Sequence, residues 1–222
     1  MAFNDSAVTR SSSSVLETNK VLRNTYSLLS LTLIFSAIMA GISMAMNVPY
    51  GFSMGASIGA LVLIWFVIPR TANSSMGIVA VFAMTGLLGF GLGPILNYYL
   101  EFENGARIIS LSLAGTGIIF LGLSGYALTT KKDFSFLGGF LVAGMIMVII
   151  VMIANFFFQF SGLSLAISAI VIMLMSGFIL YDTSRIINGG ETNYIMATVG
   201  LYLSIYNIFV SLLHLLGALG DD

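Results

Sequence analysis

Few side chains in this sequence could do chemistry, and the most informative ones lie between Asp182 and the C-terminal end. Asp182 and Arg185 stand three positions apart near the end of an apolar segment, so on a helix they are neighbours. Ser164, Ser168 and Met175 share a face with Asp182, which turns the acid toward other helices. Two interpretations are open: a local Asp182–Arg185 ion pair, or a titratable gate at Asp182, since intramembrane carboxylates favour functional roles.

A polar stripe runs through the final apolar segment. Its members follow one another at spacings of three or four residues: Ser204, Asn207, Ser211 and His214. On a helix of about 3.6 residues per turn they share one face. Because lipid penalises polar groups, we expect this face to contact other helices. Ser204 lies within about 10 Å of the depth of Asp182 by residue counting, so the two side chains could meet.

A serine hydrolase is a further possibility, because Gly122–Leu123–Ser124–Gly125 contains a GxSG tetrad and His214 is the only histidine. Residue counting places Ser124 about 6 Å from one end of its segment and His214 about 30 Å from the same side of the membrane. A general base must lie within about 3 Å of its nucleophile. We therefore expect no enzyme, and assign the tetrad to helix packing and His214 to hydrogen bonding between helices.

The composition argues against several other classes of site. The chain has no Cys and one His, which disfavours thiol chemistry and transition-metal sites. The glycine-rich stretch 86–93 is intramembrane and no Lys-Ser/Thr follows it, so a phosphate loop is not indicated. Glu101 and Glu103 could attract cations, but they fit a solvated loop better. We expect no cofactor and, at a net charge of −1, no nucleic-acid partner.

The elements that must position these residues are membrane-spanning helices. Only 8% of the residues are charged and the mean hydropathy is +1.04, values typical of an integral membrane protein. Because the backbone must bond internally in lipid, we expect an all-α protein with seven transmembrane helices. Each apolar segment is close to the about 20 residues that a span needs. The segments are 26–46, 51–68, 76–100, 106–128, 135–158, 161–183 and 193–219.

Residues 1–25 are polar and are expected to form a flexible cytoplasmic tail ahead of a transmembrane domain, 26–222. The tail is either a disordered terminus or a handle for a cytosolic unfoldase. Its charged residues would then be the recognition candidates: Arg10, Glu17, Lys20 and Arg23. With seven spans, every Lys and Arg except Arg107 falls on the side of the tail, which predicts a cytoplasmic N-terminus and an external C-terminus.

Several motifs resemble the Bax inhibitor-1 (transmembrane Bax inhibitor motif) family, and most closely its bacterial YccA branch. The C-terminal signature includes Tyr181–Asp182–Thr183, Asn193–Tyr194–Ile195 and the run 201–209. Motifs similar to the bacterial branch occur at 20–26, 93–97, 128–133, 135–139 and 189–195. The resemblance covers about residues 18–220. It implies a seven-helix fold in which the last helix is central and wrapped by the other six.

The resemblance implies two functions. Some family members leak calcium in a pH-dependent way through paired aspartates on helices six and seven. Asp182 matches the first aspartate, but Ser204 occupies the second position, so half of that sensor is missing here. A calcium or proton leak remains the alternative function.

The bacterial branch resembles a modulator of the inner-membrane AAA metalloprotease FtsH. Such a protein binds the protease, is itself a poor substrate, and restrains degradation of other membrane proteins. The resemblance therefore implies FtsH as the partner, the bacterial inner membrane as the location, and a role in protein quality control.

Overall fold

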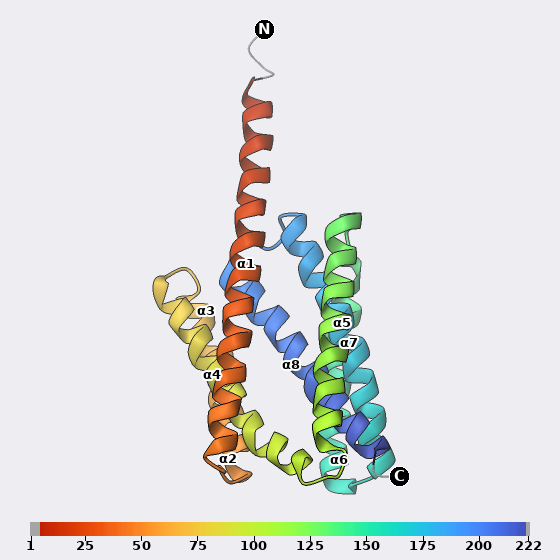
Figure 1. The fold of residues 1–222 in the computed structure, drawn as a ribbon. Helices are drawn as coiled ribbons and strands as arrows, with labels where there is room; N and C mark the ends of the chain where they lie inside the picture. The colour runs from red at the N-terminus through yellow and green to blue at the C-terminus, as the bar shows by residue number, and fades with distance from the viewer. Residues whose placement is uncertain (1–4, 221–222) are drawn as a thin grey trace.

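The computed structural model in Figure 1 describes the backbone of residues 5–220 and the side chains of 16–160 and 162–220. The described backbone is helical and contains no strand. Its elements, in chain order, are α1 (Asp5–Ala45), α2 (Gly51–Val62), the π-helical η1 (Leu63–Val67), α3 (Ile68–Thr71), α4 (Ser75–Leu100), α5 (Gly105–Thr130), the 3₁₀-helical η2 (Ser135–Leu137), α6 (Gly138–Phe158), α7 (Ser161–Ile187) and α8 (Tyr194–Leu219).

Seven of the described helical stretches are long and apolar enough to cross a membrane, which confirms the expected all-α architecture. The second span, Gly51–Thr71, joins α2, η1 and α3. Pro69 has no N–H to donate, and the wider π-helical turn lies directly before it, with the N–H of Ile68 bonded to the carbonyl of Leu63. The helix therefore passes the proline without ending.

The centre of the bundle is formed by α4 and α8. In α4, 61% of the most apolar stretch of the span is buried inside the protein, and in α8 the share is 50%. In α6 it is only 11%. The main neighbours of α8 are α7, α5 and α1, with a smaller contact to α4, whereas α2 packs on α4 and α6 packs on α7. The last helix is central, as the resemblance implied, but it is surrounded mainly by three of the other six spans.

Glycines on α4 allow α1 to cross it closely. A Cβ at Gly89 would overlap the carbonyl oxygen of Ser36 and lie 2.8 Å from its carbonyl carbon. A Cβ at Gly93 would likewise overlap Ser43. Lipid supplies no hydrophobic drive between helices, so such close backbone contact is a main source of their association.

The first helix does not break at the boundary that the sequence suggested. Residues 5–25 continue into the transmembrane part of α1, and the helix projects beyond the rest of the bundle (Figure 1). The bundle also begins before residue 26, because Thr25 is fully buried and Val21 and Leu22 pack against the core. The structure thus shows a helical stalk where we expected a tail, and the flexibility of that stalk stays a prediction.

Candidate functional site

Asp182 lies on α7 and faces the backbone of α8. Its Oδ2 is 2.8 Å from the place that a Cβ at Gly200 would occupy, so the carboxylate fits there because residue 200 has no side chain. Gly200 is one helical turn before Ser204, the residue that sequence counting brought near the acid. The acid therefore meets the last helix one turn before the polar stripe begins.

Arg185 forms its ion pair with Glu191 and not with Asp182, the acid that the sequence suggested. The ion pair in the described residues joins Arg185 Nη2 to Glu191 Oε2 at 3.5 Å, and the same nitrogen donates to the carbonyl of Gly190 at 3.0 Å. Gly189, at φ +74°, allows the chain to reverse and returns Glu191 to the end of α7. The Gly189–Gly190 pair directly before Glu191 was the sequence signal for this contact.

The Arg185–Glu191 pair should contribute little to stability. The two side chains are 33% and 21% exposed, and partly hydrated pairs are typically worth below about 1 kcal/mol. Glu191→Gln keeps an oxygen that can accept the N–H of Asn193, a bond of 2.9 Å here. We expect thermal unfolding in detergent to change by less than about 1 kcal/mol, as for the control Glu103→Gln. A loss above about 2 kcal/mol would contradict this assignment.

A layer of hydroxyl groups ties four helices together at the same end of the bundle. The Tyr26 hydroxyl on α1 bonds Ser124 Oγ on α5 and lies 3.4 Å from Thr183 Oγ1 on α7. Thr198 Oγ1 on α8 donates to the carbonyl of Thr25 at 3.3 Å. Through α1, these contacts connect α7 and α8 next to the place where Asp182 lies against Gly200.

The two residues of the hydrolase alternative belong to different contacts. Ser124 bonds Tyr26 within the layer just described. The His214 ring nitrogen Nδ1 pairs with Ser168 Oγ at 2.9 Å, toward the C-terminal end of α8. The structure therefore assembles no Ser124–His214 dyad within its described part. The serine of the tetrad bonds another helix, but its glycines do not pack closely, because a Cβ at Gly122 or Gly125 would meet nothing within 4 Å.

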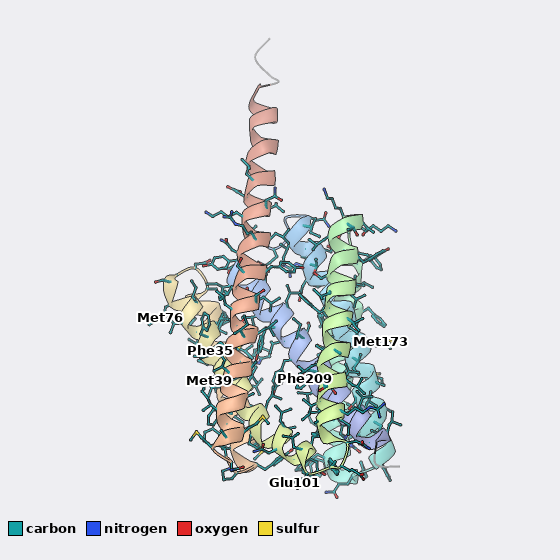
Figure 2. The ribbon with its side chains drawn as sticks, viewed as in Figure 1. Phe35, Met39, Met76, Glu101, Met173 and Phe209 are labelled. Atoms are coloured by element: carbon teal, nitrogen blue, oxygen red, sulfur yellow. The ribbon has the colours of Figure 1, made fainter. Side chains whose placement is uncertain are left out.

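The polar stripe on α8 divides into two parts. Ser204 is buried among protein atoms at 3% exposure. The other three residues, Asn207, Ser211 and His214, line a cavity of about 920 Å³ near the C-terminal ends of α4 and α8. Asn97 and Glu101 also line it, and Glu101 lies at that end of the bundle in Figure 2. The opposite face of α8 is buried as well, because Leu201 and Ile208 are fully covered.

The charged candidates on α1 are exposed at the other end of the molecule. Glu17, Lys20 and Arg23 project from the helical stalk, whereas the side chain of Arg10 lies outside the described residues. The same end carries the α5–η2 loop. There, hydrogen bonds from the side chain and the backbone N–H of Ser135 hold the pKa of Asp133 below its usual value.

Comparison with known proteins agrees with this architecture. A family model described as "Inhibitor of apoptosis-promoting Bax1" matches residues 18–221. The chain belongs to the Bax inhibitor-1 family. The resemblance drawn from the motifs is thus confirmed, and the multi-pass membrane architecture is that of a Bax inhibitor-1 protein.

Two bacterial proteins are similar to this chain over almost its whole length. The "Modulator of FtsH protease YccA" of Escherichia coli K12 is 54% identical over 94% of this chain and 94% of its own length. An "Uncharacterized membrane protein" of Vibrio cholerae serotype O1 is 48% identical over 99% of this chain and 100% of its own length. The similarity extends over nearly the full length of both relatives.

Proposed function

We propose that this Bax inhibitor-1 protein is an inner-membrane modulator of the AAA metalloprotease FtsH. The observation that carries the proposal is the 54% identity, over 94% of both chains, to a protein named for that role. An E. coli relative with the same identity is named an inner membrane protein, which supports the bacterial inner membrane as the location.

Two features of the fold support the proposal. The stalk of α1 exposes charged side chains beyond the bundle, where a cytosolic unfoldase could reach them. The crossing of α1 and α4 is close enough to exclude a single added methyl group at Gly89, as expected of a bundle that resists extraction. In this account the protein engages the protease through the stalk, is degraded slowly, and so limits the degradation of other membrane proteins.

The proposed orientation places the stalk in the cytoplasm. The Lys and Arg residues of the stalk, the end of α3, the α5–η2 loop and the end of α7 share that side, and Arg107 alone lies on the other. Cysteine labelling tests this orientation, because the native chain has no Cys. A Cys replacing Ser135 should resist a membrane-impermeant maleimide in intact spheroplasts, and one replacing Glu103 should react.

Deleting residues 1–20 tests the role of the stalk. The deletion stops before Val21, Leu22 and Thr25, which contact the core, so the bundle should still fold. We expect pull-down from membranes to recover at least five-fold less protease, and the half-life of the truncated chain to lengthen. A control chain with residues 1–20 replaced by a Gly/Ser linker of equal length separates loss of sequence from loss of length. Unchanged turnover and protease recovery in both chains would reject the stalk's role.

A pH-sensitive cation leak is the second candidate. It is favoured by the position of Asp182, which lies against α8 while Arg185 is occupied by Glu191. Ser204 weighs against it, because the family's second aspartate is missing. Calcium flux into proteoliposomes at acidic and neutral pH, compared between the wild type and Asp182→Asn, tests it. Absence of flux, or equal flux in both proteins, would remove the leak and leave the modulator proposal untouched.

A further inference from the structure

A lateral groove opens between α1 and α5, with α8 as its floor. It has a volume of about 470 Å³, and its walls include Leu33, Gly41 and Met44 on α1 and Ile109 and Gly117 on α5. In Figure 1, α8 is visible between these two helices, and Figure 2 shows Phe209, which also lines the groove, in the same place. The glycines leave the walls open, because a Cβ at Gly41 or Gly117 would meet nothing within 4 Å.

The groove spans one half of the membrane. On α1 it extends from Leu33 to Met44, and on α5 from Ile109 to Phe120, which is a rise of about 16 Å at 1.5 Å per residue on each helix. Met44 is next to the last residue of α1, so the groove starts near the surface on the C-terminal side. Half of a hydrocarbon core of about 30 Å is about 15 Å, the depth of a single leaflet.

The surface of the groove suits an apolar occupant. Its residues are mostly aliphatic and aromatic, and most of its polar side chains are already bonded inside the protein. Ser36 Oγ bonds the Tyr202 hydroxyl at 2.6 Å, and Thr116 Oγ1 donates to the carbonyl of Ser112 at 2.7 Å. Tyr206 is the exception, and its ring stacks on that of Tyr202. A polar solute would find few free hydrogen-bond partners in the groove. A hydrocarbon needs no hydrogen bonds, so it loses none on entering.

The shape and position of the groove favour a hydrocarbon chain. Its volume of about 470 Å³ is spread over about 16 Å of helix, and it lies within the depth of one leaflet. The acyl chains of that leaflet surround the two walls and extend in the same direction, so one of them can enter the groove without a second protein.

We propose that the groove between α1 and α5 is a binding site for one acyl chain of a phospholipid from the leaflet on the C-terminal side. The chain lies along α8, between the glycines of the two walls, and completes the packing of the bundle. The lipid is then a structural component of the protein rather than part of the exchanging lipid shell.

Photolabelling of the wild-type protein tests the site directly. The full chain is reconstituted with a phospholipid that carries a diazirine in the middle of one acyl chain, irradiated and digested. We expect label on peptides from α1, α5 and α8 that line the groove, at least five-fold above label on α6. Because α6 is the least buried span, it reports ordinary contact with lipid. Label spread evenly over the lipid-facing helices would overturn the proposal.

Filling the groove provides a matched test. Gly41→Leu with Gly117→Leu places side chains in the open space, and Gly122→Leu on α5 is the control, since its Cβ is also free of contacts but lies outside the groove. Native mass spectrometry should show at least five-fold less retained phospholipid for the double variant and no change for the control. Equal phospholipid retention in the double variant and the Gly122→Leu control would reject the site. A photo-crosslinking residue placed at position 41 gives a second check: if it captured another protein in membranes, the proposal would also be rejected. Should the double variant not fold, the wild-type labelling decides.

Discussion

Replacing Gly89 with alanine should destabilise the protein by at least about 2 kcal/mol, although alanine is the better helix former. The added methyl group would overlap the carbonyl oxygen of Ser36, a backbone atom that cannot move unless α1 and α4 separate. Separation would also disturb Ser36 Oγ, which bonds Tyr202 on α8. Thermal unfolding in detergent measures the loss, and the cellular half-life should shorten because the protease extracts a looser bundle more readily.

The control for this experiment is Gly122→Ala. The same methyl group there meets nothing within 4 Å, so stability should be unchanged or slightly higher. Equal stability of the two variants would mean that the α1–α4 crossing does not determine the stability of the bundle. If the Gly89→Ala chain were unstable but turned over normally, the proposal that tight packing protects the chain from the protease would be contradicted. The role of the α1–α4 crossing in stability would still hold.

Tyr202→Ala should cost about 3 to 5 kcal/mol, the range for removing a large buried aromatic side chain. Tyr202 is 1% exposed, and its hydroxyl connects α8 to Ser36 on α1 and, at 3.4 Å, to the carbonyl of Thr85 on α4. Truncation therefore removes both packing and the polar link among the three helices. Loss of the folded elution peak, or a strongly lowered unfolding temperature, is the expected result.

Tyr202→Phe separates the two contributions. It keeps the ring and leaves the Ser36 hydroxyl without this partner, which should cost about 1 kcal/mol. If Phe proved as damaging as Ala, the hydrogen bonds would dominate at this position. If Ala proved as mild as Phe, the centre of the bundle would repack more freely than its burial suggests.

The spans and the position of the last helix could be predicted because lipid requires each span to be an apolar helix and penalises exposed polar groups. Uninterrupted apolar segments predicted the seven spans to within a few residues at most ends. The stripe predicted a side of α8 that contacts protein: Ser204 is buried and His214 bonds Ser168 on α7, but Asn207, Ser211 and His214 also line the cavity. These inferences need only local composition and helical periodicity.

The partner of Arg185 was not predictable in the same way. Two residues three apart on a helix are neighbours whatever the fold, so Asp182 was the obvious acid. The choice of Glu191 depends on the reversal at Gly189, and the turn of Asp182 toward Gly200 depends on how α7 and α8 pack. The helical stalk was missed for a different reason: its polar composition indicated solvation, and solvation does not distinguish a coil from an exposed helix.

The unbroken course of α1 from residue 5 to residue 45 has a mechanical consequence. A force applied to its free end would act along the helix axis and would slide α1 past α4 rather than peel it away. Sliding must break the contacts at Gly86, Gly89 and Gly93 together, because Phe35, Ser36 and Ser43 oppose them along one line. Forced unfolding is governed by the unfolding rate, so this geometry would make the chain slow to dislodge even where its equilibrium stability is modest.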